Sequence, residues 1–200
     1  MAIFGVVRTA CGIAEIRDLV EEDVAAIVRY WMTSSPDFLD FMGVDRERLG
    51  GEAEVGRRMK VAIRSGEMEQ KSLAFALVLN QQMVGYTLLN RYGEHENYSH
   101  WHILTPGLRG KGISTSLYPL RLRTYFQAAP INRLIHQTRT RNTAVNLMLD
   151  KFVPVVETKQ IEKPDGVAQP GEFHIRHVLR EDIPGIVRRA AELGIVIEPA

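Results

Sequence analysis

The chain has 200 residues, of which 45% are hydrophobic and 24% are charged, and its formal net charge is +1. That length suits one domain with a sizeable core, and the near-neutral charge argues against nucleic acid or an anionic membrane as a partner. No apolar run approaches the roughly 18 residues of a membrane helix. Cys11 is the single cysteine, so an internal disulfide is excluded, and a reducing cytoplasm fits the composition.

The beginning of the chain, residues 1–18, is mildly apolar but has no basic start and is interrupted by Arg8. We therefore expect an N-terminal strand or extension there rather than a signal peptide. We expect residues 1–200 to form a single domain, with the C-terminal helix 181–193 as an extension or a dimer element.

The spacing of apolar residues predicts alternating helices and strands. Acids at 21–23 favour the start of a first helix, which ends before Pro36, and an irregular apolar segment, 38–44, follows it. Pro119 lies inside a later helix, where we expect a kink or a delayed start. The predicted helices are 21–32, 53–64, 113–127, 142–151 and 181–193, and the predicted strands are 14–19, 73–79, 83–90, 97–104, 133–138, 155–158 and 172–179.

Two stretches of the chain echo one another in register. Residues 16–28 and 175–187 each contain Ile-Arg, then two acids, then Ile-Val at the same spacing. A vestigial second domain would produce this pattern. Convergence would produce it too, because a strand, two acids and an amphipathic helix form a common unit.

The stretch that carries most information is 98–117, which reads YSHWHILTPGLRGKGISTSL. A strand leads into a glycine-rich turn, and a helix follows. Such a turn leaves several backbone N–H groups unpaired at the positive end of the helix dipole, which favours a phosphate or pyrophosphate. Gly110 and Gly112 let the backbone approach the ligand, and Arg109 and Lys111 bring positive charge.

Two common phosphate-binding motifs do not fit this turn. A P-loop needs Ser or Thr after its lysine, and Lys111 is followed by Gly112. No G-x-G-x-x-G and no repeated βαβ pattern indicate a Rossmann fold.

The segment 104–114, LTPGLRGKGIS, resembles the acyl-CoA loop of GNAT-type N-acetyltransferases, in which an apolar strand, a proline and R-G-x-G-x-G/A precede a helix. Ser114 replaces the last Gly or Ala of that pattern. When the family pattern is written Q/R-x-x-G-x-G instead, Gly107 occupies the place of Gln or Arg. The order of predicted elements also resembles the family, so the resemblance covers most of the chain.

The resemblance implies an α/β (α+β) fold with a central mixed, mostly antiparallel sheet flanked by helices. It also implies an enzyme that transfers an acetyl group from acetyl-CoA, without a metal, to a primary amine of a small molecule, peptide or protein. A catalytically weak acyl-CoA-binding regulatory protein, which keeps the site but not the turnover, is the alternative. Neither the acceptor nor the acyl length can be read from these residues.

The resemblance further assigns cofactor contacts to this chain. Main-chain groups of Ile103 and Leu104 would bind pantetheine. Asn142 corresponds to an asparagine that contacts the pantetheine arm, and it also fits an ordinary helix N-cap. The pyrophosphate would lie on Arg109, Gly110, Lys111, Gly112, Ile113 and Ser114.

Acetyl transfer needs a group that takes the proton of the amine, and histidine is the best-suited side chain at neutral pH. His100 and His102 lie on one face of the predicted strand with Tyr98. Some members of the family carry a His-x-His that corresponds to Tyr98 and His100, and others use a glutamate, for which Glu96 is the nearest candidate. We take His100 as the preferred base, with His102 and Glu96 behind it. These histidines would equally serve as polar residues that line a cleft.

The family often places a tyrosine on the following helix as the acid that returns a proton to the CoA thiolate. The corresponding position here is near Leu149, and no tyrosine is present. Tyr118 or water would have to substitute. Acceptor recognition would fall to 31–44 and to the predicted hairpin of 73–79 and 83–90. The aromatic and Met residues there either line an apolar pocket or form ordinary core. Three acids in or directly after 31–44 would attract an amine or remain solvated: Asp37, Asp40 and Asp45.

Overall fold

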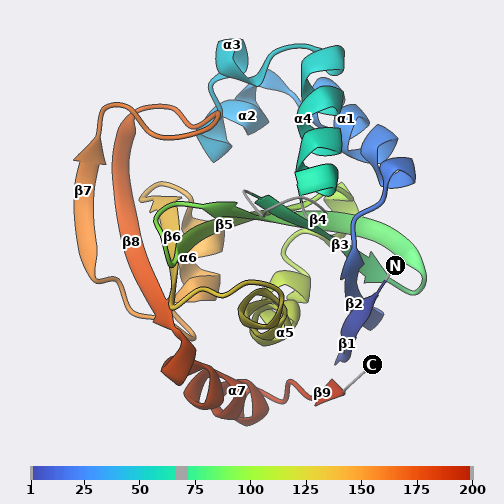
Figure 1. Cartoon of the computed structure of the whole chain (residues 1–200), viewed down its shortest axis with the longest axis vertical. Coiled ribbons are helices and arrows are strands. Elements are labelled where there is room, and N and C mark those ends of the chain that lie inside the picture. Colours follow the sequence, from blue (N-terminus) through green and yellow to red (C-terminus); the bar gives the residue numbers. More distant parts are fainter. Residues whose placement is uncertain (1, 66–71, 199–200) are drawn as a thin grey trace.

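The computed structural model of the chain describes residues 2–65 and 72–198 (Figure 1). Nine strands form one sheet in the order β7-β8-β6-β5-β4-β3-β2-β1-β9. All neighbouring strands are antiparallel except β5 and β6. The strands are β1 (Ile3–Thr9), β2 (Gly12–Asp18), β3 (Ser72–Leu79), β4 (Gln82–Arg91), β5 (Glu96–Ile103), β6 (Arg133–Arg139), β7 (Glu157–Ile161), β8 (Gly171–Leu179) and β9 (Ile197–Glu198).

Helices cover both faces of this sheet. In Figure 1, α1 to α4 lie over one face, and α5, α6 and α7 lie on the other. This arrangement confirms the predicted α/β (α+β) class with a mixed, mostly antiparallel sheet. The helices are α1 (Val24–Thr33), α2 (Pro36–Met42), α3 (Arg46–Leu49), α4 (Glu52–Ser65), α5 (Ile113–Ala128), α6 (Thr143–Leu149) and α7 (Ile183–Glu192), with short 3-10 turns at Glu21–Asp23, Pro106–Leu108 and Arg180–Asp182.

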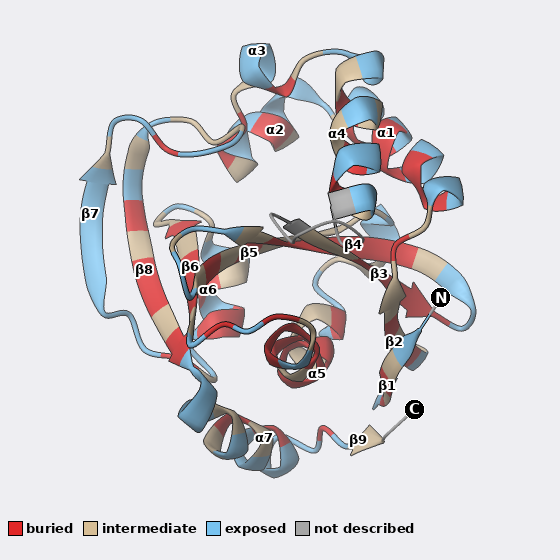
Figure 2. Ribbon diagram, viewed as in Figure 1, coloured by how far each residue is buried: buried red, intermediate tan, exposed pale blue. Residues whose placement is uncertain are grey.

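The helix α5 is surrounded by protein. The curved sheet and α7 enclose it, and buried residues occur all around its circumference (Figure 2). A helix without a polar face is typical of such a central position. Pro119 lies in the middle of α5, which begins at Ile113, so the expected late start was wrong.

The segment 38–44 was expected to be irregular, and that prediction was wrong. The Ser35 side chain accepts a hydrogen bond from the Phe38 N–H at 3.2 Å, Pro36 occupies the first turn, and Gly43 ends the helix with φ of 74°. These are the usual N-terminal cap, N-terminal proline and C-terminal glycine of a helix. The signals were present in the sequence, but the same residues had been assigned only to the end of the first helix.

The other predicted elements are present with small shifts. The expected N-terminal strand is present as β1, the structure adds β9 beside it and the short helix α3, and β7 begins at Glu157 rather than at 155. The two stretches that echo one another, 16–28 and 175–187, share a local contact. In both, an aspartate oxygen accepts the N–H three residues before it: Val20 N–H to Asp23 at 3.1 Å and Leu179 N–H to Asp182 at 2.8 Å. A vestigial second domain and convergence both remain compatible with this contact.

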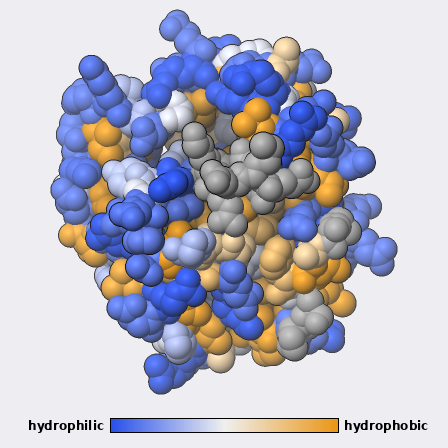
Figure 3. Space-filling view, viewed as in Figure 1, coloured by the Kyte–Doolittle hydropathy of each residue, from blue (hydrophilic) through white to orange (hydrophobic). Residues whose placement is uncertain are grey.

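The C-terminal helix α7 packs within its own chain. Ile186 and Ala190 belong to the core around α5, so a homodimer through this helix stays a prediction. On the face drawn in Figure 3, hydrophobic residues gather at the lower right, near β1, β2 and β9. Ile3 and Ile13 are among the exposed apolar residues of these strands. Within the described ranges, no helix is long and apolar enough to cross a membrane.

Two arginine side chains are fully buried, Arg121 of α5 and Arg176 of β8, and Arg176 pairs with Asp150. Arg121 is 1% exposed, and its guanidinium lies 3.7 Å from the ring centre of Trp101. Its Nε and Nη2 atoms have no hydrogen-bond partner among the described residues. Burial lowers the pKa of Arg121, since the charged form is poorly solvated there.

This unpaired cation generates a prediction about stability. Replacing Arg121 with Met keeps most of the volume and removes the desolvation penalty, which is several kcal/mol for a buried ion. The lost contact with Trp101 is worth about 2 kcal/mol. We expect Arg121→Met to raise the free energy of unfolding in urea by about 1 kcal/mol. Arg123→Met, on the same helix and partly exposed, should change it by less than about 0.5 kcal/mol. A loss above about 1 kcal/mol in Arg121→Met would show that Arg121 has a partner in the folded protein.

Candidate functional site

The glycine turn adopts the conformation that the sequence predicts. It connects β5 to α5, with Gly110 at φ of 72° and Gly112, the N-cap of α5, at φ of 78°. Both values lie in the left-handed region, where glycine is strongly favoured. A Cβ added at either glycine would meet no atom within 4 Å. The turn therefore presents bare backbone to open space.

This backbone carries a row of unpaired donors. The first N–H of α5 with a helical partner is that of Ser116, which donates to Gly112 C=O at 2.9 Å. Lys111 beside them is exposed, and no ion pair of it occurs among the described residues. Within the described part of the chain, no partner is found for the N–H groups of Gly110, Gly112, Ile113, Ser114 and Thr115. Together with the positive end of α5, these groups form an anion site.

Beside the turn, β5 and β6 diverge. Their parallel pairing comprises three residue pairs and ends at Tyr98 and Ile135. Because hydrogen-bonding directions alternate along β5, and the Leu104 N–H donates to Val84 C=O at 2.8 Å, the main-chain groups of Trp101 and Ile103 point into the opening between the strands. The Leu104 N–H is thus not available to a ligand, which corrects part of the prediction for that residue.

The side chain of Arg109 does not lie over the turn. Its guanidinium lies 4.2 Å from the ring centre of Phe38 in α2, and its Nε donates to Ile103 C=O at 3.3 Å. The expectation that Arg109 would bring its charge to the same place as Lys111 was therefore wrong. The charge of Arg109 lies on the side of the turn that faces α1 and α2.

The two predicted histidines share one face of β5. Their rings are 5.6 Å apart and half-buried, and His102 stacks on Tyr86 of β4 at 5.1 Å. The Nδ1 atom of His102 lies 3.4 Å from the Tyr30 hydroxyl. Burial lowers the pKa of His100 to about 4. Burial, followed by the charges of His100 and Arg109, holds the pKa of His102 well below its usual value. Both rings are therefore neutral at pH 7.

The other candidates have structural partners. Glu96 pairs with Arg133 at the start of β5, about 13 Å along the strand from His100. The Asn142 side chain caps α6 by accepting the Val145 N–H at 3.4 Å. Near Leu149, which is buried, Asp150 pairs with Arg176 at 2.5 Å. As expected, α6 provides no tyrosine.

A buried polar chain marks the point where β5 and β6 part. The Tyr118 hydroxyl lies 3.0 Å from His136 Nε2, and His136 Nδ1 lies 3.3 Å from Ser99 Oγ. Burial, then Arg121 and Arg176, lowers the pKa of His136 to about 3. The sequence gives no signal that connects His136 with Ser99, because only the β5–β6 register brings the two together.

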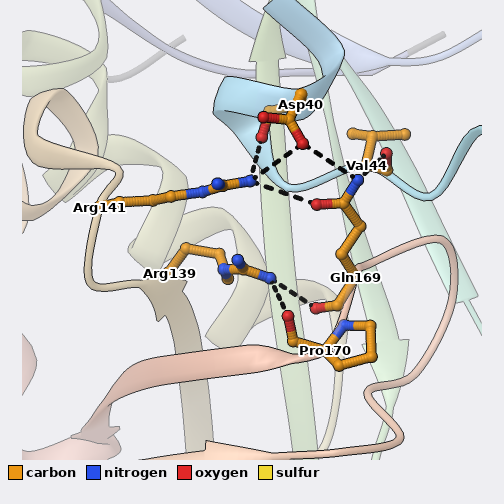
Figure 4. A network of polar contacts seen from close by, with 6 residues as sticks. All are labelled: Asp40, Val44, Arg139, Arg141, Gln169 and Pro170. Carbon is orange, nitrogen blue, oxygen red and sulfur yellow. Dashed lines mark hydrogen bonds and ion pairs between the residues drawn. The ribbon is translucent and has the colours of Figure 1, made fainter.

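The loop between β7 and β8 is fastened to α2, as Figure 4 shows. Arg141 donates to Gln169 and Asp40 at 3.2 and 3.4 Å, and Arg139 donates to the Gln169 carbonyl at 2.8 Å. The same loop reaches the histidine face, since Gly166 lies near the Tyr98 hydroxyl. Nothing in the sequence signalled the contact of Arg141 and Gln169 with Asp40, which joins segments more than 100 residues apart.

A groove lies between α1, the start of α2 and the end of β5. Its volume is about 420 Å³, and Tyr30, Phe38, Leu104 and Arg109 are among the residues that line it. Of the acids proposed to attract an amine, Asp40 is paired with Arg141 and Asp45 caps α3. Phe38, one aromatic residue of the acceptor segment 31–44, therefore lines a groove, but neither of these two acids is left free.

No family model and no curated protein sequence matches the chain. Solved structures do match. RimJ of Mycobacterium smegmatis with a CoA disulfide has a TM-score of 0.74 at 17% identity, covering 100% of this chain and 97% of that one. RimL, a ribosomal L7/L12 alpha-N-protein acetyltransferase, with coenzyme A has a TM-score of 0.70 at 15% identity, covering 89% and 98%. The aminoglycoside acetyltransferase AAC(6')-Ib with coenzyme A has a TM-score of 0.67 at 13% identity, covering 86% of this chain and 98% of that one.

These matches run along nearly the whole of this chain and of each matched chain. The chain therefore has the fold of the GNAT acetyltransferases, as its glycine turn and order of elements predicted. Three histidines with lowered pKa lie where that fold brings β4, β5 and β6 together.

The buried histidines predict a loss of stability in mild acid. Because their pKa values are lower in the folded protein, the unfolded chain binds protons first as the pH falls through about 6.5. The free energy of unfolding has its full value above that pH. It decreases as the pH falls towards the pKa of each histidine in the folded protein, which is about 4 for His100. Between pH 7.5 and 5.5 we expect about 1 kcal/mol of loss for each histidine, measured by urea unfolding.

His100→Gln provides the control for this prediction, because no hydrogen bond of the His100 ring occurs among the described side chains. The variant should lose about 1 kcal/mol less than the wild type over the same pH interval. An identical pH dependence in both proteins would mean that His100 titrates in the folded protein as it does in the unfolded chain.

Proposed function

We propose that the protein is an acetyl-CoA-dependent N-acetyltransferase that acts on a primary amine. The observation that carries the proposal is a row of N–H groups without a partner among the described residues, those of Gly110, Gly112, Ile113, Ser114 and Thr115, next to the opening between β5 and β6. A pyrophosphate and a linear amide chain, joined in that order, fit these two adjacent features. Coenzyme A has both parts.

The chain's own groups divide the binding between them. The turn would hold the pyrophosphate through backbone donors, with Lys111 adding charge. The main-chain groups of Trp101 and the N–H of Ile103, whose C=O already accepts from Arg109 Nε, would pair with the pantetheine amides as an added strand does. The Asn142 carboxamide keeps its NH₂ group for the pantetheine arm, because the cap uses only its oxygen. When bound, acetyl-CoA supplies an activated acyl group with a thiolate that leaves readily.

His100 is the preferred acceptor of the proton that the amine loses when its nitrogen bonds to the acyl carbon and the C–S bond breaks. Its ring is neutral at pH 7, so its unprotonated nitrogen is ready to accept a hydrogen bond from the amine or from a water molecule. With its pKa near 4 it is a weak base, which favours a relay that passes the proton on to solvent. His102, held by Tyr30 and Tyr86, would orient that relay.

No residue on α6 replaces the missing acid. Tyr118 is fully buried beside the point where β5 and β6 part, and its hydroxyl already contacts His136. A thiol with a pKa near 8.5 leaves without prior protonation. We therefore propose that Tyr118 or water returns the proton after the C–S bond has broken.

The second candidate function is an acyl-CoA-binding regulatory protein. The lowered pKa of His100 and the absence of an acid on α6 favour it. Turnover with an amine separates the two functions, since a regulator would bind acetyl-CoA and release no CoA.

The acceptor class follows from the matched structures only in outline. By their names, RimL acts on a ribosomal protein and AAC(6')-Ib on aminoglycosides. We propose a small-molecule or protein amine as acceptor, and the cytoplasm as the place where acetyl-CoA and the acceptor meet.

The anion site predicts that Gly112→Asp will abolish acetyl-CoA binding. A carboxylate at the N-cap of α5 would compete for the free N–H groups and repel the pyrophosphate. We expect micromolar binding of acetyl-CoA to the wild type in calorimetric titration, and a loss of at least about 100-fold in the variant.

Two variants serve as controls for that loss. Gly112→Asn has the same size without the charge and tolerates positive φ, so it should bind more tightly than Gly112→Asp. Gly185→Asp places the same charge in α7, where a Cβ meets nothing within 4 Å, and should bind as the wild type does. If wild-type protein fails to bind acetyl-CoA, both candidate functions are wrong.

Removal of the proposed base should slow acetylation. We expect His100→Ala to lower kcat by at least about 100-fold at pH 7.5, because general-base catalysis contributes about that much. The exposed His95 provides the control, and His95→Ala should retain full activity. Release of CoA during an amine screen measures the rate, and an unchanged rate in His100→Ala would remove His100 from the mechanism.

A further inference from the structure

The groove beside the glycine turn is distinct from the opening between β5 and β6. It lies on the other side of β5, between α1, the start of α2, and Met83 at the beginning of β4. Its volume of about 420 Å³ lies in the range of roughly 300–1,000 Å³ that holds small molecules. A ligand here would not displace a chain bound in the opening.

The groove leads to the histidines. Tyr30 is the shared wall, because its side chain lines the groove and its hydroxyl lies 3.4 Å from His102 Nδ1. Arg109 also joins the two places, since its charge contributes to the lowered pKa of His102. A molecule seated in the groove would therefore extend towards the place where the amine must be deprotonated.

Two cations line the groove without a carboxylate partner. Arg29 of α1 is exposed, and Arg109 lies over Phe38, where the Ile103 carbonyl is the one hydrogen-bond acceptor found for it among the described residues. None of the described residues that line the groove is an aspartate or a glutamate, and no ion pair of Arg29 or Arg109 occurs in the described part of the chain. Asp37, one residue before Phe38, does not line it.

From these contacts we infer that the groove holds an anionic group of the acceptor, so that the acceptor is a small amine that also carries a carboxylate. That this ligand is the acceptor depends on the proposed acetyl transfer. That the groove binds a carboxylate does not depend on it. A guanidinium over an aromatic ring keeps its edge free, and that edge pairs with a carboxylate in a planar, bidentate way.

The same charges disfavour polycationic acceptors. A compound with several ammonium groups would meet Arg29 and Arg109 with no acid to offset them, and like charges at close range oppose binding. This chain would therefore differ in acceptor from an enzyme that acts on aminoglycosides, although it shares the fold.

Direct binding tests the inference with two probes of nearly the same shape, para-(aminomethyl)benzoate and para-(aminomethyl)benzamide, titrated into the full chain in the presence of CoA and followed by ligand-observed NMR. We expect the carboxylate to bind about tenfold more tightly at low ionic strength, and the difference to shrink in high salt. Arg29→Gln should reduce the preference to about threefold or less. Arg188→Gln, on the exposed face of α7, removes the same charge elsewhere and should keep the preference.

Three results would overturn the inference: equal or tighter binding of the benzamide, no binding of either probe to the wild type, or an undiminished preference in Arg29→Gln. Failure of the proposed function would look different. In that case acetyl-CoA would not bind or no CoA would be released with any amine, while the preference for the carboxylate would remain measurable.

Discussion

The burial of α5 on all sides is the constraint on which the rest of the structure depends. The sheet curves around this helix, which packs against β1, β2, α6 and α7. This packing places the N-terminus of α5 at the end of the turn that follows β5. Two left-handed glycines in the turn then bring together five N–H groups that have no partner in the described part of the chain. The anion site is thus a consequence of core packing and of the two glycines.

The short parallel pairing of β5 with β6 is the second structural determinant. Three residue pairs hold the strands together before they part, and the buried chain from Ser99 through His136 to Tyr118 fills the angle between them. Polar groups buried at that depth need partners, and this chain supplies them within the protein. Beyond this polar chain, towards the glycine turn, main-chain groups of β5 line the opening, and they are suited to an amide chain.

The sequence predicted what depends on local chemistry. Gly110 and Gly112, the alternation of His100 and His102, and the helix cap at Asn142 could all be read from short spacings, and the structure has each of them in place. It did not predict the direction of Arg109, because that side chain follows the ring of Phe38, which comes from a helix in a segment that the sequence predicts to be irregular. It also missed the fastening of Gln169 to α2. That contact depends on the length and path of a loop more than 100 residues away.

The distribution of acids explains why a nearly neutral chain has a cationic groove. Two carboxylates of the segment beside the groove have structural roles: Asp40 pairs with Arg141, and Asp45 caps α3. Neither of these two acids is left free to neutralise the groove. The histidines beside it are neutral because they are buried, so Arg29 and Arg109 determine the local charge. Selectivity for a carboxylate would then depend on the pairing of nearby acids with structural partners. A substitution that freed Asp40 from Arg141 would weaken that selectivity without changing a residue that lines the groove.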